Sequence, residues 1–315
     1  MTASIWGGRA VTPKSEHDQT VNVDGRTLTL RRLDKVLYPE AGTTKAEVLD
    51  YYARVAPAML PHLRDRPVTR IRWPDGTSSK PFFEKNIPTH APDWLRTVEL
   101  PTPGSSRNRE TLVFPLIDDT AGLVWAANLA ALELHVPQWT VGPRGGVHNP
   151  NRLVIDLDPG PPAGLTTCAQ VAMILRQRLA DDGLEAVPVT SGSKGLQLYV
   201  PLDGKQSAMV VHAYARALAE TLSAEHPDLV VAKMAKNVRP GKVLLDWSQN
   251  NPAKTTICPY SMRGRAQPWV AAPRSWDELS SPDFVQLTSA SVLRRIEESG
   301  DLAQALLTGG STLPG

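Results

Sequence analysis

The pattern of apolar and polar positions predicts two halves, which meet in a stretch rich in glycine and proline at residues 141–150. In the first half, strands are mixed with helices, and one helix follows the capping box Thr44-x-x-Glu47. The elements expected there are a strand, this helix, a second strand and a largely apolar helix (26–30, from 44 onwards, 68–73 and 120–134). Residues 101–110 are predicted to form a polar loop.

The second half has a regular order of elements. Apolar runs and helical periodicity predict a strand, a helix, two strands, a helix and two further strands (152–158, 167–182, 186–190, 196–202, 207–224, 229–233 and 243–247). The order β-α-β-β-α-β is that of a split βαβ, ferredoxin-like unit, which is also the arrangement of an RNA-recognition-motif (RRM) fold. The predicted fold class is therefore α+β. Its parts are a flexible tail, an N-terminal α/β half, an RRM-like catalytic half and a C-terminal tail (1–22, 23–150, 151–300 and 301–315).

The composition favours a protein of the reducing cytoplasm. Of the 315 residues, 41% are hydrophobic, which suffices for real cores, and no apolar run is long enough to span a membrane. Residues 1–24 lack the apolar core of a signal peptide. Two cysteines, Cys168 and Cys258, are too few for a disulfide framework or for a structural zinc site by themselves.

The charge is distributed unevenly along the chain. A formal net charge of +2 excludes a uniformly basic nucleic-acid binder. Residues 232–265, however, contain seven basic residues and one acidic residue, Asp246. Charge runs are most often solvated surface, but a basic run around a single aspartate suits a polyanion held beside a metal ion.

Two aspartates, Asp156 and Asp158, lie near the end of the strand predicted at 152–158. Alternate side chains of a strand point to the same face, so these carboxylates share a face with Cα atoms roughly 6.6 Å apart. Carboxylates this close repel each other unless a cation lies between them. A turn would explain Asp158, which begins an Asp-Pro-Gly sequence, but not Asp156 inside an apolar run. The pair therefore predicts a metal site.

A third acid, Asp246, ends another apolar strand, and a neighbouring strand of the inferred sheet would bring it to the same site. Three carboxylates without a His/Cys cluster select hard divalent ions such as Mg²⁺ or Mn²⁺. Two such ions about 3.5–4 Å apart can activate a hydroxyl and neutralise the leaving group of a phosphoryl transfer. The basic residues that would supply countercharge for a triphosphate are Arg239, Lys242, Arg263 and Arg265.

Three further motifs have both a structural and a functional interpretation. The hairpin Ser191-Gly-Ser-Lys194-Gly offers backbone N–H groups to phosphate oxygens, but it is not a P-loop, and a turn without a ligand is the simpler alternative. His135 is either a structural histidine or a ligand-binding one. Phe82 and Phe83, which are flanked by lysines, are either packed in a core or form a stacking platform for a nucleobase.

Three of these motifs together resemble the signature of the archaeo-eukaryotic primase superfamily, namely Asp156-Leu-Asp158, Ser191-Gly-Ser-Lys-Gly and Leu-Asp246-Trp. The similarity is closer still to the polymerase domain of bacterial DNA ligase D and its stand-alone, primase-polymerase-type relatives. Supporting stretches, among them Asp34-Lys-Val-Leu-Tyr-Pro and Thr255-Thr-Ile-Cys-Pro-Tyr-Ser-Met-Arg-Gly-Arg, are spread over nearly the whole chain.

The resemblance implies a template-dependent nucleotidyltransferase of non-homologous end joining or of gap filling in excision repair. It would add nucleotides, with ribonucleotides preferred, to a primer 3′-OH at gaps or break ends, using two Mn²⁺ or Mg²⁺ ions. The implied partners are DNA with a 5′-phosphate and an NTP or dNTP, with Ku and a DNA ligase in the same pathway. A monomer in the bacterial nucleoid, without a membrane partner, is expected.

The same resemblance implies a role for individual residues. The metal ligands would be Asp156, Asp158 and Asp246, which are also the catalytic acids. The residues expected to hold or adjoin the nucleotide are His135, Ser191, Lys194, Arg239, Arg263 and Gln249. Those expected to contact DNA are Lys35 and Lys45 at the 5′-phosphate, and Phe82 and Phe83 at the template.

The chain departs from the family's pattern at three positions. Gln197 stands where histidine is common, so a phosphate contact there would be neutral and would not titrate. Ile71 stands where some relatives have lysine, and Arg32 replaces a common asparagine beside the lysine of the 5′-phosphate site. Whether the chain is a stand-alone protein or part of a larger ligase, and whether it primes de novo, stays open.

Other functions fit only part of the pattern. A haloacid-dehalogenase (HAD-type) phosphatase also uses Asp-x-Asp after an apolar strand, but it needs Thr or Val where this chain has Gly160. A metal-dependent glycosyltransferase would not explain the basic stretch around Asp246. A catalytically inactive DNA-end-binding module with a decayed primase fold would have no need of three intact acids.

Overall fold

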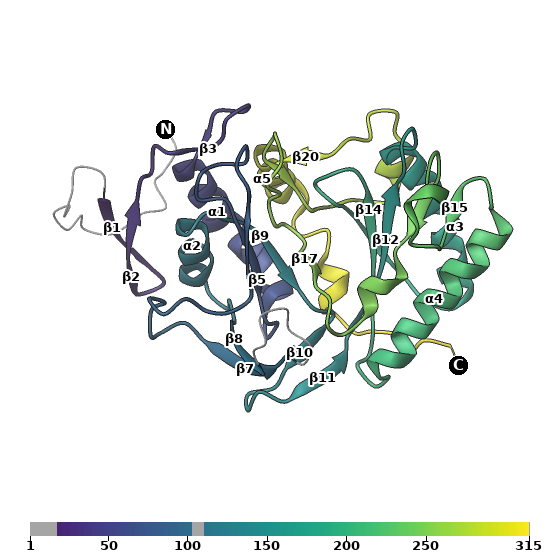
Figure 1. The fold of residues 1–315 in the computed structure, drawn as a ribbon, viewed down its shortest axis with the longest axis horizontal. Coiled ribbons are helices and arrows are strands. Elements are labelled where there is room, and N and C mark those ends of the chain that lie inside the picture. The colour runs from purple at the N-terminus through teal and green to yellow at the C-terminus, as the bar shows by residue number, and fades with distance from the viewer. Residues whose placement is uncertain (1–17, 103–109, 315) are drawn as a thin grey trace.

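A computed structural model describes residues 18–102 and 110–314 of the chain. The predicted tail at 1–17, positions 103–109 of the predicted polar loop, and residue 315 lie outside the described residues. The described chain builds two main hydrophobic cores, which lie side by side along the long axis of the molecule (Figure 1). No helix of the described ranges is long and apolar enough to cross a membrane.

The first core surrounds an antiparallel four-stranded sheet with the order β17-β9-β5-β6. The elements of this core are α1 (Lys45–Leu63), β5 (Thr69–Arg72), β6 (Phe82–Glu84), α2 (Thr120–Asn128), β9 (Ala131–Val136) and β17 (Thr256–Ile257). Four hairpins surround it: β1 (Asp18–Val23) with β2 (Arg26–Arg31), β3 (Val36–Tyr38) with β4 (Thr43–Thr44), β7 (Thr97–Pro101) with β8 (Thr111–Pro115), and β10 (Trp139–Val141) with β11 (Val147–Pro150). The β1–β2 hairpin lies at the outer end, on the left of Figure 1.

Helix α1 begins where the capping box predicts. The hydroxyl of Thr44 accepts a hydrogen bond from the backbone N–H of Glu47, and the Glu47 carboxylate accepts one from the N–H of Thr44 at 2.7 Å. Two buried tyrosines of α1 reach across the core with their hydroxyls. Tyr51 donates to the carbonyl of Tyr260 at 2.7 Å, and Tyr52 donates to the carbonyl of Leu132 at 2.6 Å.

The apolar stretch that was predicted as one helix, 120–134, is a helix followed by a strand. Helix α2 ends at Asn128, and Ala130 adopts a positive φ of 57°, after which the chain continues as β9. Because α2 is buried on most sides and β9 on both faces, the stretch is apolar throughout and carries no periodicity that separates the two states. His135 therefore lies on a strand and shares a face with Glu133.

The second core is built on a six-stranded sheet with the order β15-β16-β12-β14-β13-β19. Strand β12 is antiparallel to both of its neighbours, and β13 is antiparallel to β14, so β12 and β13 are parallel with β14 between them. This is a split βαβ unit, and the predicted RRM-like arrangement is confirmed. Its elements are β12 (Arg152–Pro159), α3 (Leu165–Asp181), β13 (Val187–Thr190), β14 (Leu196–Pro201), α4 (Ala208–Glu225), β15 (Val230–Val231), β16 (Val243–Leu245) and β19 (Ala272–Pro273).

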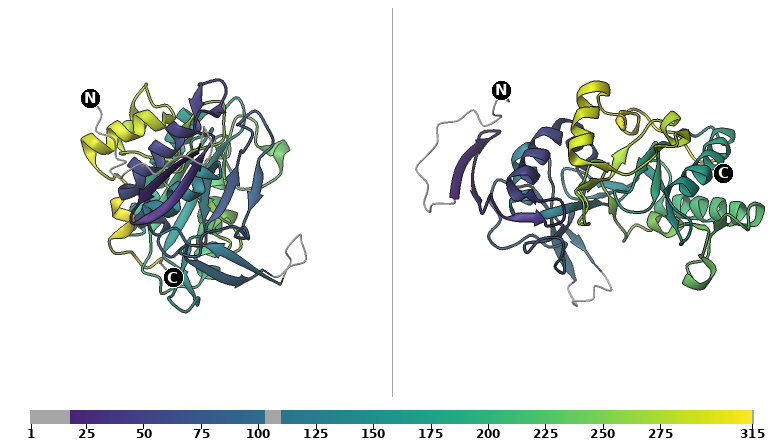
Figure 2. Two further views of the ribbon diagram at one scale, coloured as in Figure 1. Left: turned by 90° about the vertical axis from the view of Figure 1, so that its left-hand side faces the viewer. Right: turned by 90° about the horizontal axis from the view of Figure 1, so that it is seen from above.

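The two faces of this sheet pack against different partners. Leu153, Ile155 and Leu157 of β12 lie in the second core with α3 and α4, whereas Val154 belongs to the first core. The views of Figures 1 and 2 agree that α3 and α4 lie on the side away from the first half. Asp156 and Asp158 share the face of Val154, so their carboxylates are turned toward the first half.

Both predicted tails contain packed structure at their inner ends. Residues 18–23 form β1, and its Val21 and Val23 are buried in the first core. The segment 301–314 folds back onto the molecule, with Leu313 buried in the second core and the N–H of Ser311 donating to the carbonyl of Pro201 at 3.1 Å. The prediction of tails is therefore wrong for residues 18–22 and 301–314, because both segments are short but contain apolar side chains that pack in the cores, among them Val21, Leu306 and Leu313.

The division of the chain at residue 150 stays a prediction. The remaining elements of the second half are β18 (Trp269–Val270), β20 (Leu287–Thr288) and α5 (Ser289–Ser299). Helix α5 places Val292 and Leu293 in the first core and lies beside α1 in Figure 1. Segments that follow residue 150 therefore complete the core of the first half.

The departure at Arg32 has a conformational cost. Arg32 adopts a left-handed backbone conformation with φ 53°, which costs a residue with a Cβ roughly 1–2 kcal/mol and which asparagine tolerates better. We expect Arg32→Asn to raise the free energy of unfolding by about 1 kcal/mol in urea titrations. Arg64→Asn is the matched control, because Arg64 is exposed at φ −51°. An equal gain at both positions would contradict the backbone explanation.

Candidate active site

The carboxylates of Asp156, Asp158 and Asp246 converge where β12 and β16 end. One oxygen atom of each residue lies within 4.8 Å of the others. The convergence follows from the sheet, because β16 pairs with the end of β12 and the N–H of Asp246 donates to the carbonyl of Asp156 at 2.8 Å. The structure thus brings together the three predicted metal ligands, which come from two neighbouring strands.

The acid cluster carries negative charge that its own surroundings do not neutralise. Burial raises the pKa of Asp156 well above its ordinary value, and the charges of Asp158 and Asp246 raise it further. Burial and Asp246 also raise the pKa of Asp158, against the opposing charges of Arg239 and Arg263. A divalent cation would relieve this repulsion, and three carboxylates are a donor set that hard cations use. The residues therefore fit Mg²⁺ or Mn²⁺.

Two neutral amides orient the acids. The side-chain NH₂ of Gln197 donates to Asp156 at 3.2 Å, and Gln197 itself accepts a hydrogen bond from the hydroxyl of Tyr199 at 3.0 Å. Gln249 donates to Asp246 at 2.9 Å. Gln197, for which a neutral phosphate contact was expected, donates to Asp156, and Gln249, which was predicted beside the nucleotide, donates to Asp246; both therefore contact predicted metal ligands. An uncharged amide fixes the position of a carboxylate without cancelling the charge that attracts a cation.

The Ser191–Gly195 hairpin is a tight turn at the edge of the acid cluster. The hydroxyl of Ser191 accepts hydrogen bonds from the N–H groups of Ser193 at 3.3 Å and Gly195 at 3.1 Å, so it shapes the turn, while Lys194 is exposed. A Cβ on Gly195 would lie 2.1 Å from the carbonyl oxygen of Leu157. The absence of a side chain at Gly195 therefore lets the hairpin approach the strand that carries Asp156 and Asp158.

A second close approach brings the basic loop 232–242 to the site. A Cβ on Gly160 would lie 2.2 Å from the carbonyl oxygen of Arg239, and the N–H of Gly160 donates to the carbonyl of Lys242 at 2.8 Å. The Arg239 guanidinium donates to the carbonyl of Met234, and its Nε has no hydrogen-bond partner among the described residues. Lys242, by contrast, donates to the carbonyl of Pro227, and the predicted countercharge Arg265 is exposed.

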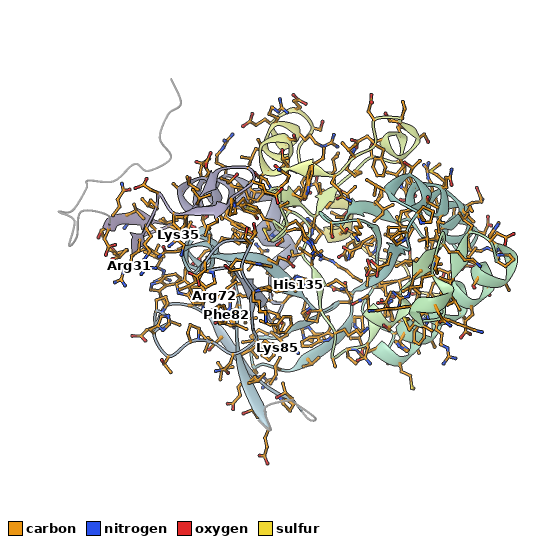
Figure 3. The ribbon with its side chains drawn as sticks, turned by 45° about the horizontal axis from the view of Figure 1, so that its top comes forward. Arg31, Lys35, Arg72, Phe82, Lys85 and His135 are labelled. Carbon is orange, nitrogen blue, oxygen red and sulfur yellow. The ribbon has the colours of Figure 1, made fainter. Side chains whose placement is uncertain are left out.

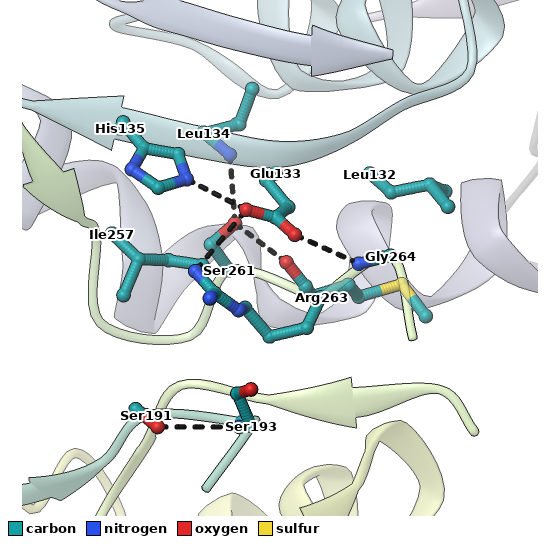
Figure 4. A network of polar contacts seen from close by, with 12 residues as sticks. Leu132, Glu133, Leu134, His135, Ser191, Ser193, Ile257, Ser261, Arg263 and Gly264 are labelled. Carbon is teal, nitrogen blue, oxygen red and sulfur yellow. Dashed lines mark hydrogen bonds and ion pairs between the residues drawn. The ribbon is translucent and has the colours of Figure 1, made fainter. Parts of the chain in front are cut away.

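Glu133 joins two of the predicted nucleotide-binding residues (Figure 4). Its carboxylate accepts hydrogen bonds from His135 at 2.8 Å and from the backbone N–H of Gly264 at 3.0 Å, and it forms an ion pair with Arg263 at 3.1 Å. Burial opposes the charge of Glu133, but the hydrogen bond from His135 and the charge of Arg263 outweigh it and lower the pKa of Glu133. Glu133 was not among the predicted site residues, because in a helix predicted at 120–134 it would not share a face with His135.

The departure Ile71 lies beside this network. It is directly opposite Glu133 in the pairing of β5 with β9, and directly opposite Phe83 in the pairing of β5 with β6. Residues directly opposite each other in an antiparallel pair project from the same face of the sheet. An aliphatic side chain at this position offers Glu133 no competing ion pair.

Lys35 and Lys45 lie together in a basic cluster that is separate from the cluster of Asp156, Asp158 and Asp246. The N–H of Lys45 donates to the carbonyl of Lys35 at 2.8 Å, and the Lys45 ammonium donates to the carbonyl of Arg31 at 2.6 Å. Burial lowers the pKa of Lys45 to about 8, with contributions from Arg32, Lys35 and Arg31. Lys35 forms an ion pair with Asp75 at 3.0 Å. Concentrated positive charge of this kind suits a phosphate group.

Phe82 and Phe83 are exposed, with relative accessibilities of 55% and 56%, so they are not core residues. They line an open groove of about 1140 Å³ together with Lys85 and Trp139. In Figure 3 Phe82 lies beside Arg72, with Arg31 and Lys35 further to the left of the view and Lys85 and His135 further to the right. Exposed aromatic rings beside basic residues form a surface on which nucleobases can stack.

Comparison with known proteins gives one consistent family. A family model described as "LigD, primase-polymerase domain" matches residues 44–303. The multifunctional non-homologous end joining DNA repair protein LigD of Mycobacterium tuberculosis is 48% identical over 284 residues, which is 89% of this chain and 37% of that protein. The bifunctional non-homologous end joining protein LigD of Bacillus subtilis is 34% identical over 270 residues, which is 85% of this chain and 42% of that protein.

The fold has a close counterpart among solved structures. The polymerase domain from Mycobacterium tuberculosis ligase D, in complex with DNA, matches with a TM-score of 0.85 and 47% sequence identity. The match covers 90% of this chain and 99% of that one. The chain thus corresponds to that domain and spans less than half the length of the curated relatives above.

Proposed function

Because the chain belongs to the LigD primase-polymerase domain family, we propose that it adds nucleotides to a primer 3′-OH on a DNA template, at gaps or at ends joined by non-homologous end joining. The observation that carries this proposal is the convergence of Asp156, Asp158 and Asp246 within 4.8 Å. The charges of Arg239 and Arg263 act on Asp158, and that of Arg263 also acts on Asp156, as a site for a metal-bound triphosphate requires. The family assignment leaves the phosphatase alternative without support, and the intact acids speak against an inactive module.

The proposed chemistry follows from the residues around the acids. Two Mn²⁺ or Mg²⁺ ions would supply charge neutralisation at the transferred phosphoryl group and acidify the attacking hydroxyl. Asp156 and Asp158 would hold both ions and Asp246 one of them. The side chains proposed to hold the triphosphate are His135, Lys194, Arg239 and Arg263, and Ser191 would keep the hairpin in shape for them. Gln197 and Gln249 would keep the carboxylates in place.

Two of the proposed DNA contacts, Lys35 and Phe82, are labelled in Figure 3. Lys35 and Lys45 would bind the 5′-phosphate on the far side of a gap, and Phe82 and Phe83 would stack on template bases. Ku and a DNA ligase are the partners that this pathway would require, and action as a monomer belongs to the same proposal.

The test is primer extension on a gapped duplex with a 5′-phosphate, in the presence of Mn²⁺. We expect template-dependent extension, faster with NTPs than with dNTPs, and no extension after chelation of the metal. DNA binding without extension under any metal would support the inactive module, and phosphate release from a simple monoester would support the phosphatase. A preference for dNTPs would contradict only the ribonucleotide part of the proposal.

The role of Lys35 can be tested separately. We expect Lys35→Ala to weaken binding to a gap with a 5′-phosphate about tenfold, because a charge-assisted contact is lost. Binding to the same gap with a 5′-hydroxyl should change less than about twofold. For the phosphorylated gap, the slope of log K against log salt concentration should become less negative by about one, because one fewer counterion is released. Fluorescence anisotropy with the two labelled duplexes measures both. Equal losses on the two substrates would contradict a specific phosphate contact.

A further inference from the structure

Glu133 is a buried acid in a region that the proposed function assigns to a triphosphate. Its exposed fraction is 5%, and it is ionised, since its neighbours lower its pKa. A negative charge at this position repels a polyphosphate, and burying it costs free energy of hydration. The ionised carboxylate of Glu133 therefore has a role other than packing.

Both oxygens of the Glu133 carboxylate are occupied by groups that arrive from different segments. Oε2 accepts a hydrogen bond from Nε2 of His135 at 2.8 Å and forms an ion pair with Nη1 of Arg263 at 3.1 Å, while Oε1 accepts from the N–H of Gly264 at 3.0 Å. Because an ionised carboxylate only accepts, the ring of His135 must carry its proton on Nε2. One carboxylate thus determines the ring tautomer of His135 and the position of the Arg263 guanidinium.

The rest of Arg263 is fixed by other contacts. The hydroxyl of Tyr38 donates to its carbonyl at 2.9 Å, and a Cβ on Gly192 would lie 2.5 Å from its Cγ, so its stem lies against the Ser191–Gly195 hairpin (Figure 4). The Nε of Arg263 is buried and has no hydrogen-bond partner in the described parts of the chain. The guanidinium is thus tethered through Nη1 while other donors remain available.

We propose that Glu133 is the positioning residue for the incoming nucleotide, holding His135 and Arg263 in place before the triphosphate arrives. The inference rests on the proposed function. Without the carboxylate, His135 would lose a hydrogen bond and Arg263 an ion pair to the same oxygen atom, and the long arginine side chain would have to be ordered at each binding event. Preorganisation of this kind improves nucleotide affinity even though the carboxylate itself repels phosphate.

The test uses Glu133→Gln, which keeps the volume and an acceptor for Gly264 but removes the charge. We expect the KM for the nucleotide to rise about tenfold, with kcat and the Kd for gapped DNA changing less than about threefold. Glu133→Asp, which keeps the charge on a shorter stem, should recover part of the loss. A purely structural role would not raise the nucleotide KM selectively.

The matched control is Glu297→Gln. Glu297 forms an exposed ion pair with Arg54 at 2.7 Å on helices α5 and α1, so the same substitution breaks a glutamate–arginine pair outside the proposed site. We expect its kinetic constants to equal those of the wild type. If Glu133→Gln does not unfold cooperatively, Glu133→Asp carries the test against the same control.

A double-mutant cycle shows whether Glu133 acts through Arg263. In an Arg263→Ala background, Glu133→Gln should change the nucleotide KM less than about threefold, because the group to be positioned is already absent. The inference is overturned if Glu133→Gln leaves the nucleotide KM unchanged, if it lowers KM because repulsion is relieved, or if its effect is equally large in both backgrounds.

Calorimetric binding of ATP with Mn²⁺ separates this inference from the proposed function. Wild-type protein that binds ATP but extends no primer would refute the proposed function and still allow the comparison with Glu133→Gln. Weaker ATP binding by the variant would then support positioning by Glu133. Equal or tighter binding by the variant, or no binding by either protein, would refute it.

Discussion

Replacing Asp156 with asparagine is expected to slow primer extension by at least roughly a thousandfold while raising the thermal stability of the metal-free protein. The activity falls because one of the three proposed metal ligands is lost. The stability rises because burial and two neighbouring carboxylates raise the pKa of Asp156, so its ionised form costs the folded state free energy. The opposite signs of the two effects are typical of a residue that serves function at the expense of stability.

The pH dependence of this stability gain has a defined sign. A carboxyl whose pKa is raised in the folded state stabilises the folded protein when it is protonated. This contribution to the free energy of unfolding is lost as the pH rises from the ordinary aspartate pKa to the raised pKa of the folded state. The melting temperature of the variant should therefore exceed that of the wild type more at pH 7 than at pH 4. Mn²⁺ should stabilise the wild type more than the variant, and binding of gapped DNA should be retained.

The control is Asp283→Asn, which makes the same substitution at an exposed position. Near-normal extension by Asp156→Asn would refute the metal assignment.

The largest expected effect on stability comes from His62, which lies fully buried between Arg152 and Asp301. Its Nδ1 accepts from Nη2 of Arg152 at 3.0 Å, so its Nε2 carries the proton and donates to Asp301 at 3.3 Å. This arrangement requires a neutral ring, and burial lowers the pKa of His62 to about 4. The unfolded state therefore binds a proton more readily than the folded state between pH 6.5 and about 4.

This stabilisation is fully present above pH 6.5 and is lost as the pH falls toward 4, and it amounts to about 3 kcal/mol. Glutamine can accept from Arg152 and donate to Asp301 without titrating. We therefore expect the wild type to lose about 3 kcal/mol more unfolding free energy than His62→Gln between pH 7 and pH 4, measured in urea. His90→Gln, at an exposed position, should behave as the wild type does. Equal acid sensitivity of the wild type and His62→Gln would refute a neutral buried His62.

Much of the second core could be predicted from the sequence because its strands alternate or are flanked by turn residues. Strand β12 has apolar side chains for one core at Leu153, Ile155 and Leu157, and this period of two also placed Asp156 and Asp158 on one face. Asp246 could be joined to them because the β-α-β-β-α-β order fixes which strand lies beside β12. Local patterns were sufficient to predict a strand and the direction of its side chains wherever one face of the strand was apolar and the other polar.

The remaining features depend on contacts between distant segments. The stretch 120–134 is apolar on all sides, so no pattern marks the change from α2 to β9, and Glu133 was missed as a result. The pairing of Gln197 with Asp156 requires the register of β14 against β12, in which these residues are directly opposite. Leu313 is a single buried side chain after residues 308–312, which contain only Thr, Gly and Ser, so no periodic pattern marks it as part of a core.

The path of residues 256–264 limits how this protein can be recombined with its homologues. Thr256 and Ile257 pair with β9, Tyr51 donates to the carbonyl of Tyr260, and the N–H of Met262 donates to the hydroxyl of Tyr52 at 3.1 Å. Although this stretch follows Asp156, Asp158 and Asp246 in the chain, it is hydrogen-bonded to elements that precede them. A chimaera with one crossover near residue 150 would therefore join parents inside a hydrogen-bonded interface, and the stretch 256–264 would have to be inherited together with α1 and β9.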